Sequence, residues 1–266
     1  MGELEGKLTK ALKSREERSI LRRLPVGTGS LIDFCSNDYL SLASNSHLRS
    51  HFLKEINKHE KILGSGGSRL LIDMPEHAVL ETRLASFFNA PAALLFNSGF
   101  DANSGFFAAV PQEGDVVLYD EYIHASVHHG MRSSRARNST WSFKHNCLAS
   151  LERLIRTISD DRPTVRLGSS SVFVAVESLY SMDGDFSPLR EIVGLLDLIL
   201  PQGNGHLIVD EAHATGLYGE EGRGIVSMLG LETRVTARLH TFGKALSGSG
   251  GLLFALPSSS IYSTGS

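Results

Sequence analysis

The chain has 266 residues, of which 41% are hydrophobic and 21% charged, and its 26 basic and 29 acidic side chains give a net charge of −3. This balance is typical of a globular protein with one large or two modest domains, and it excludes a disordered chain and a basic nucleic-acid-binding surface. No apolar run approaches the length of a membrane span, and the two cysteines, Cys35 and Cys147, exclude a disulfide scaffold. These features predict a cytoplasmic protein that binds no nucleic acid and has no membrane span.

Residues 1–30 are predicted to form an N-terminal helical arm. Leu4, Leu8 and Leu12 recur at helical spacing among lysines and glutamates, which indicates an amphipathic helix that packs on its own protein or on a partner. The segment lacks the apolar core of a secretory signal, and its glutamates distinguish it from a mitochondrial presequence.

From residue 75 onward, helical patterns alternate with short apolar runs. Pro75 opens a helical pattern over 75–90, and further patterns follow at about 101–110, 147–158 and 188–199. The apolar runs between them are typical of strands buried on both faces of a parallel sheet; they are residues 92–96, 116–119, 172–176, 207–209, 239–241 and 252–256. The sequence therefore predicts an α/β fold with a mostly parallel central sheet flanked by helices.

Polar residues follow the apolar runs at the points where the strands would end. In open α/β sheets, ligands bind beyond the carboxyl ends of the strands. We therefore expect Asp, His, Ser and Lys side chains to meet at one edge of the sheet, from the segments 97–100, 120–124, 177–184, 210–213 and 242–244.

Three familiar motifs are incomplete. Residues 64–69 are glycine-rich but lack the GK[ST] of a P-loop, and Asn97-Ser98-Gly99 lacks the first glycine of a nucleophile elbow. His124 and His128 have a metal-like i, i+4 spacing, but the sequence identifies no third ligand. We therefore predict no metal site.

The strongest signal is the pair Asp210 and Lys244. Asp210 ends a buried strand, where a carboxylate is costly unless it is paired with a cation. Lys244 lies in a glycine-containing apolar turn, where its pKa should be lowered and its amine nucleophilic. The pair suits pyridoxal 5'-phosphate (PLP), because a lysine can hold the aldehyde as a Schiff base while an aspartate keeps the ring nitrogen protonated. An ordinary Asp–Lys ion pair is the alternative that these two residues leave open.

Eight motifs in a fixed order together resemble the α-oxoamine synthases, and most of all their 8-amino-7-oxononanoate synthase branch. The motifs are SNDYL at 36–40, GSGGSRL at 64–70, SGFDAN at 98–103, HAS at 124–126, SMDGD at 181–185, VDEAHATG at 209–216, GEEGRG at 219–224 and HTFGKAL at 240–246. The resemblance runs from about residue 30 to residue 256. It implies a fold type I PLP enzyme, a homodimer or a heterodimer with a homologue, that condenses an amino acid with an acyl-CoA and releases CO2.

The same resemblance implies roles for individual residues. Lys244 would be the Schiff-base lysine, Asp210 the partner of the ring nitrogen and His213 the partner of the ring hydroxyl. His124 would stack on the ring and meet the substrate. The remaining implied contacts are Gly99, Phe100 and Thr241 with the phosphate, Ser181 beside the cofactor, Asn37 and Arg22 with the substrates, and Glu177 near the active site.

The chain departs from the resemblance after Lys244. Family members continue into a C-terminal small domain that carries the arginine for the amino acid's α-carboxylate, whereas this sequence ends at Ser266. We accordingly expect an N-terminal arm (1–30), a PLP-binding large domain (31–256) and a truncated Ser-rich tail (257–266). A non-catalytic partner of a longer homologue and a PLP-dependent aminotransferase are the alternatives that remain open.

Overall fold

The computed structural model describes residues 2–24, 32–60, 62, 64, 66–72 and 74–255, which fall into two compact units, residues 1–36 and 37–266. The first unit contains the helix α1 (Glu3–Glu17), in which no residue is buried and the leucines of the predicted apolar face are exposed. The predicted tail, 257–266, lies outside the described residues.

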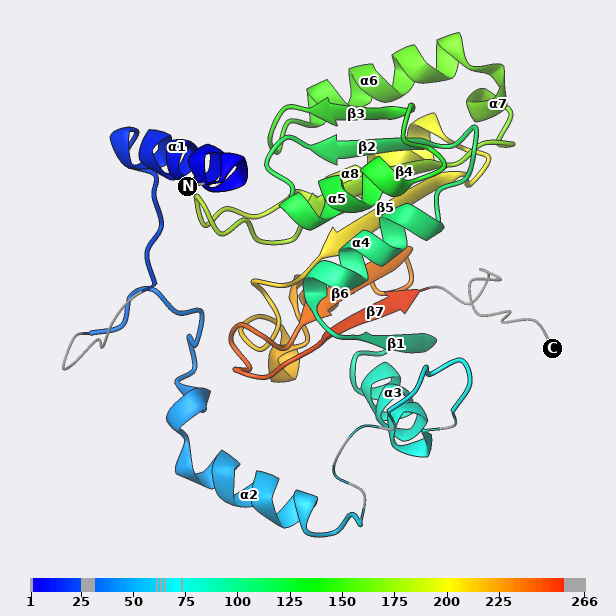
Figure 1. The fold of residues 1–266 in the computed structure, drawn as a ribbon. Helices are drawn as coiled ribbons and strands as arrows, with labels where there is room; N and C mark the ends of the chain where they lie inside the picture. Colours follow the sequence, from blue (N-terminus) through cyan, green and yellow to red (C-terminus); the bar gives the residue numbers. More distant parts are fainter. Residues whose placement is uncertain are drawn as a thin grey trace. The chain divides into compact units, whose positions relative to one another are not determined.

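The second unit is built around a seven-stranded sheet in the order β1-β7-β6-β5-β4-β2-β3 (Figure 1). Only β7 is antiparallel to its two neighbours, so the sheet is mostly parallel, as predicted. The strands are β1 (Ala92–Phe96), β2 (Val116–Asp120), β3 (Thr140–Phe143), β4 (Val172–Glu177), β5 (Gly205–Asp210), β6 (Ala237–Thr241) and β7 (Gly251–Ala255). Six of them match the predicted apolar runs. The edge strand β3 was not predicted because only its last residue is buried.

Helices cover both faces of the sheet, as the continuous apolar strands require. On β4, Val174 packs with the core formed by α6 and α8, whereas Phe173 and Ala175 pack with the core formed by α4 and α5. The helical segments of the second unit are η1 (Leu42–Ser44), α2 (Ser46–Ile56), α3 (Pro75–Phe87), α4 (Gly99–Ala109), α5 (Ala125–Ser133), α6 (Leu148–Asp161), α7 (Pro163–Arg166), α8 (Leu189–Ile199), η2 (Glu220–Gly222) and α9 (Ile225–Met228). Among the described residues, none of the helices has the length and apolar character that a membrane crossing needs.

The strand directions bring the predicted chemistry to one edge of the sheet. Glu177, the last residue of β4, is the register partner of Asp210, the last residue of β5. Thr241 ends the neighbouring strand β6 and pairs with Gly251, the first residue of β7, which also pairs with Phe96 at the end of β1. The turns that leave β1, β4, β5 and β6 therefore meet at this edge.

Candidate active site

Lys244 and His213 are in direct contact. The Lys244 Nζ lies 2.7 Å from the His213 Nε2. Burial lowers the pKa of Lys244, and the negative charges of Asp210 and Glu177 only partly oppose this effect. Burial, together with the charge of Lys244, also lowers the pKa of His213 to about 4. His213 is therefore neutral at pH 7, its Nε2 accepts the hydrogen bond from the lysine, and its own proton lies on Nδ1.

The Asp210 carboxylate is buried, and each of its oxygens accepts one hydrogen bond. The Asn103 Nδ2 on α4 donates to Oδ2 at 2.7 Å, and the backbone N–H of Ala212 donates to Oδ1 at 2.9 Å. Two donors on different oxygens fix the rotation of the carboxylate. Asp210 is thus a fixed negative charge at the end of β5, beside the amine of Lys244.

Glu177 is a second buried carboxyl group beside Asp210. Burial and the charge of Asp210 raise the pKa of Glu177 to about 8, although Lys244 and a hydrogen bond from the His124 backbone act in the opposite direction. Glu177 therefore holds a proton more readily than an exposed glutamate does. The site can accordingly keep one carboxylate and one carboxylic acid side by side.

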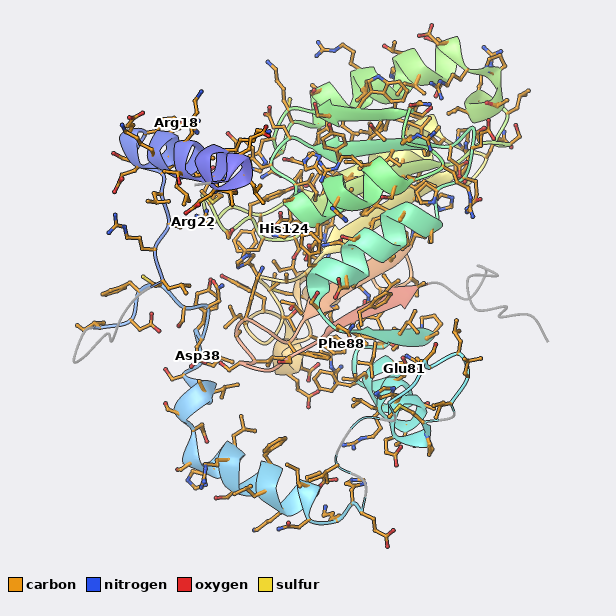
Figure 2. The ribbon with its side chains drawn as sticks, in the orientation of Figure 1. Arg18, Arg22, Asp38, Glu81, Phe88 and His124 are labelled. Carbon is orange, nitrogen blue, oxygen red and sulfur yellow. The ribbon has the colours of Figure 1, made fainter. Side chains whose placement is uncertain are left out.

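His124 is the N-cap residue of α5 (Figure 2). Its Nδ1 accepts the backbone N–H of Ser126 at 3.2 Å and lies 2.7 Å from the hydroxyl oxygen of the same serine. The proton of the neutral ring therefore lies on Nε2, the nitrogen left for a ligand. The ring is exposed and lies edge-to-face with Phe100, with 6.2 Å between the ring centroids.

The start of α4 lies against the end of β6. A side chain at Gly99 would place its Cβ 3.0 Å from the Thr241 Cβ, so glycine permits this close approach. The Ser98 hydroxyl accepts the N–H of Asp101 at 3.0 Å and caps the eleven-residue helix. The backbone N–H groups of Gly99 and Phe100 begin α4, and Gly99 lies against the Thr241 side chain, in an arrangement suited to an anion.

Three further residues that the resemblance implies are Ser181, Asn37 and Arg22. Ser181 is exposed in the turn after β4. The Asn37 Oδ1 accepts a hydrogen bond from the Tyr39 hydroxyl at 2.8 Å. Arg22 is exposed and belongs to the N-terminal unit (Figure 2). The roles of these three residues remain predictions.

The glycine-rich motif at 64–70 holds an ion pair. The two terminal nitrogens of Arg69 donate to the two carboxylate oxygens of Glu81 on α3, at 2.7 and 2.5 Å. Glu81, labelled in Figure 2, also accepts the N–H of Leu95 in β1 at 2.7 Å. Arg69 thus connects the motif to α3 and β1. Ser65 lies outside the described residues.

Sequence reasoning missed two features of this edge. The first is Asn103, which lies one helical turn after Gly99. The i, i+4 spacing puts both residues on the same face of α4, and this spacing is the signal that could have identified Asn103. The second is His145. No sequence motif around it predicts a role, because its partners come from distant parts of the chain.

His145 lies between two carboxylates. Its Nδ1 is 2.8 Å from an Asp120 oxygen at the end of β2, and its Nε2 is 2.8 Å from an Asp185 oxygen in the loop after β4. The ring also stacks on Tyr122, with 4.3 Å between the centroids. A carboxylate only accepts hydrogen bonds, so both ring nitrogens must donate, and His145 must be protonated to hold both partners.

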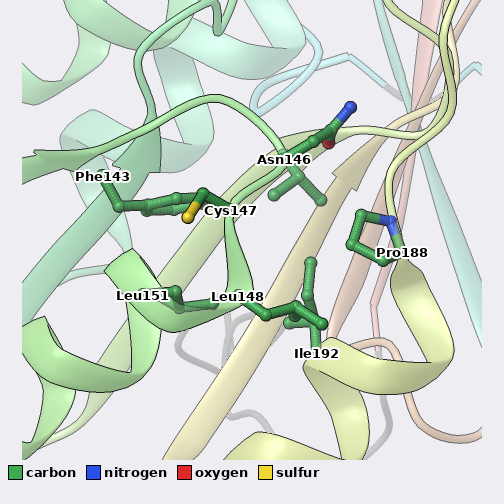
Figure 3. Close-up of a pocket in the computed structure, with 8 residues that line it drawn as sticks. Phe143, Asn146, Cys147, Leu148, Leu151, Pro188 and Ile192 are labelled. Atoms are coloured by element: carbon green, nitrogen blue, oxygen red, sulfur yellow. The ribbon is translucent and has the colours of Figure 1, made fainter.

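The turn that carries His145 is anchored in the core by its next two residues. Asn146 and Cys147 line a narrow pocket between the start of α6 and the start of α8 (Figure 3). The Asn146 Nδ2 donates to the same Asp185 oxygen at 2.8 Å. The apolar residues of this pocket are Phe143, Leu148, Leu151, Val176, Pro188 and Ile192. Through the hydrogen bond from Asn146 to Asp185, the turn therefore fixes one end of the loop that contains Ser181.

We expect this arrangement to make stability depend on pH. Burial lowers the pKa of His145, but the hydrogen bonds and charges of Asp120 and Asp185 outweigh it and leave the pKa raised. Because the pKa of His145 is higher in the folded protein than in the unfolded chain, its protonation stabilises the fold. This stabilisation is fully present at pH values below the unfolded pKa of about 6.5, and it is lost as the pH rises through the folded pKa. His145→Gln should therefore cost more stability at pH 6 than at pH 9 in urea unfolding. His47→Gln, at an exposed histidine, is the control; an equal loss at both pH values for His145→Gln would contradict the charged bridge.

Comparison with known proteins places the chain in a family. The family model described as aminotransferase class I and II matches residues 30–262. The chain is 46% identical over 253 residues to an 8-amino-7-oxononanoate synthase of Emericella nidulans, covering 94% of this chain and 61% of that protein. It is 44% identical over 228 residues to the aminoacyl transferase sphA of Aspergillus fumigatus, covering 85% of this chain and 48% of that protein. The chain thus spans about half to three fifths of the length of these relatives.

Solved structures agree with these sequence matches. The serine palmitoyltransferase of Sphingomonas wittichii superimposes with a TM-score of 0.72 at 27% identity, covering 84% of this chain and 52% of that chain. A further serine palmitoyltransferase structure, which holds PLP, superimposes with a TM-score of 0.71 at 26% identity over the same shares of the two chains. The sheet, the ordered motifs and these matches confirm the fold type and the resemblance inferred from the sequence. The chain belongs to the aminotransferase class I and II family of PLP-dependent enzymes, in its α-oxoamine synthase branch.

Proposed function

We propose that this chain carries the PLP site of an 8-amino-7-oxononanoate synthase-like acyltransferase, which joins an amino acid to the acyl group of an acyl-CoA. The observation that carries the proposal is the Lys244 amine, 2.7 Å from a neutral His213 and beside the fixed carboxylate of Asp210. The names of the two curated relatives support a transferase that handles amino-acid and acyl groups.

The residues at the sheet edge fit PLP. Asp210 supplies a negative charge for the protonated ring nitrogen, and His213 supplies an Nδ1–H donor for the ring hydroxyl. The N–H groups at the start of α4 and the Thr241 hydroxyl suit the phosphate. His124 offers an exposed ring at the N-terminus of α5 for stacking. When bound, PLP supplies an electron sink that stabilises negative charge on the α-carbon of the amino acid.

The chain's own groups hold and move protons around that chemistry. Because burial lowers its pKa, Lys244 has a larger fraction of neutral amine than an exposed lysine, and this amine is the nucleophile for the cofactor aldehyde. Burial and the charge of Asp210 raise the pKa of Glu177, so its carboxyl group can hold a proton near the site, and His124 presents an Nε2–H to a ligand. In the net reaction the α-carbon bonds to the acyl carbon of the thioester, the carboxyl group leaves as CO2, and the CoA thiol is released.

Reduction and peptide mapping test the proposal. The purified chain would be incubated with PLP, reduced with borohydride and digested, and we expect the pyridoxyl label on the peptide that contains Lys244. Release of CoA thiol would then be measured with glycine, alanine or serine and an acyl-CoA. Folded protein without a label would overturn the PLP site and favour a non-catalytic partner. Labelled protein that exchanges amino groups without releasing the thiol would favour an aminotransferase. The dimer and the cytoplasmic location remain predictions.

A further inference from the structure

Asn103 makes a long-range contact to the most important carboxylate of the site. The residue is buried on α4, and its Nδ2 donates to the Asp210 Oδ2 at 2.7 Å, although the two residues are 107 positions apart. Asn103 lies one turn after Gly99, so the helix whose first N–H groups suit the phosphate also carries the donor for Asp210.

The orientation of the Asn103 amide follows from its partner. A carboxylate only accepts hydrogen bonds, so the amide nitrogen must face Asp210 and the amide oxygen must face away. That oxygen is buried and has no hydrogen-bond partner among the described residues. An unpaired buried acceptor destabilises a fold, so Asn103 is not the side chain that stability alone would favour at this position.

The charge of the donor is also important. A lysine or arginine at position 103 would neutralise Asp210 and compete with any cation that the site binds. A neutral amide holds the carboxylate without competing in this way.

We propose that Asn103 is a positioning residue that holds the Asp210 carboxylate in the orientation that meets the ring nitrogen of PLP. The inference rests on the proposed function, since it assigns Asn103 a role toward the same cofactor. The Asn103 side chain reaches the proposed cofactor site through its hydrogen bond to Asp210.

The test compares Asn103→Ala with Ser104→Ala. Ser104, the next residue on α4, is partly buried, and its hydroxyl donates to the Ser126 carbonyl oxygen at 3.2 Å, so this control deletes one hydrogen bond of the same helix away from Asp210. Three quantities would be measured for each protein: the dissociation constant of PLP, the pH titration of the absorbance of bound PLP, and the thermal unfolding of the cofactor-free protein.

We expect Asn103→Ala to weaken PLP binding about tenfold or more, as loss of a hydrogen bond to a charged group implies. The absorbance titration should shift by about one pH unit, because the ring nitrogen loses part of the stabilisation of its proton. Ser104→Ala should change neither quantity. An Asn103→Ala variant that binds PLP and titrates like the unmodified protein would overturn the inference.

Asn103→Asp covers the case in which the alanine variant does not fold. It keeps the size of the side chain but removes the donor and adds a negative charge, so we expect weaker PLP binding than in Asn103→Ala. A double variant provides a further check: Asn103→Ala should have little additional effect in an Asp210→Asn background, and an undiminished effect there would contradict action through Asp210. Failure of the unmodified chain to bind PLP would overturn the proposed function itself, whereas normal binding with no effect of Asn103 substitutions would overturn this inference only.

Discussion

Lys244→Ala is expected to abolish the borohydride-stable attachment of PLP completely. A reducible bond to the aldehyde requires a primary amine, and Lys244 is the amine that burial, His213 and Asp210 place at the sheet edge. The measurement is the mass of the reduced protein and of its peptides after incubation with PLP. We expect the variant to gain no pyridoxyl mass, whereas the unmodified protein gains one.

Lys144→Ala is the matched control for this experiment. Lys144 is exposed in the turn after β3, so it reports on adventitious reaction of PLP with surface amines. Its removal should leave the label on Lys244 unchanged. The Lys244→Ala variant should also keep its fold, because loss of a buried amine removes a charge that the surroundings disfavour. A specific label that survives in Lys244→Ala would refute the assignment of the lysine.

Gly224→Ala is expected to produce the largest loss of stability. Gly224 has φ +99°, which L side chains rarely adopt, and a Cβ there would overlap the Glu211 carboxylate and lie 2.8 Å from its carboxyl carbon. Glu211 is fully buried, and its Oε1 accepts the N–H groups of Ile225 and Val226, both at 3.1 Å. The strain of about 1–2 kcal/mol and the lost helix cap of about 1 kcal/mol together predict a loss of about 2–3 kcal/mol.

For a domain of this size, that loss corresponds to a fall in Tm of about 4–12 °C, which calorimetry or circular dichroism would measure. Gly230→Ala separates the two causes. Gly230 also has a positive φ, +63°, but no atom lies within 4 Å of the position of its Cβ. The control should therefore show the backbone strain without the collision. If the two variants lost the same stability, the collision with Glu211 would make no contribution.

Most of the fold could be predicted from the sequence because its central strands are buried on both faces. A continuous apolar run such as 172–176 has few alternatives to a parallel strand, and six strands were found in this way. The strand at 140–143 was missed because an edge strand needs no such run. The helix at 46–56 was also missed, since none of its residues is buried and its apolar spacing is weak.

The candidate site could be predicted where its residues follow strands. Asp210 and Thr241 end strands and Lys244 follows one, so parallel topology alone predicts that they share an edge. Asn103 and His145 could not be placed in this way. Their partners lie 107 and up to 40 positions away, and only the packing of α4 and of the turn after β3 brings them into contact. The ionisation of Glu177 likewise depends on burial, which no local pattern encodes.

The antiparallel strand β7 determines how much of the chain the cofactor site requires. Among the described residues it is the one strand that pairs with β1, and it pairs with β6 on its other side. A shorter chain that kept Lys244 but ended before Gly251 would lack β7. Strand β1 would then have no strand to pair with, and the unpaired edge of β6 would be a site for aggregation. The start of α4 would then no longer be held beside Thr241. The proposed PLP site therefore depends on the strand Gly251–Ala255 as well as on Lys244, so the lysine motif alone does not define it.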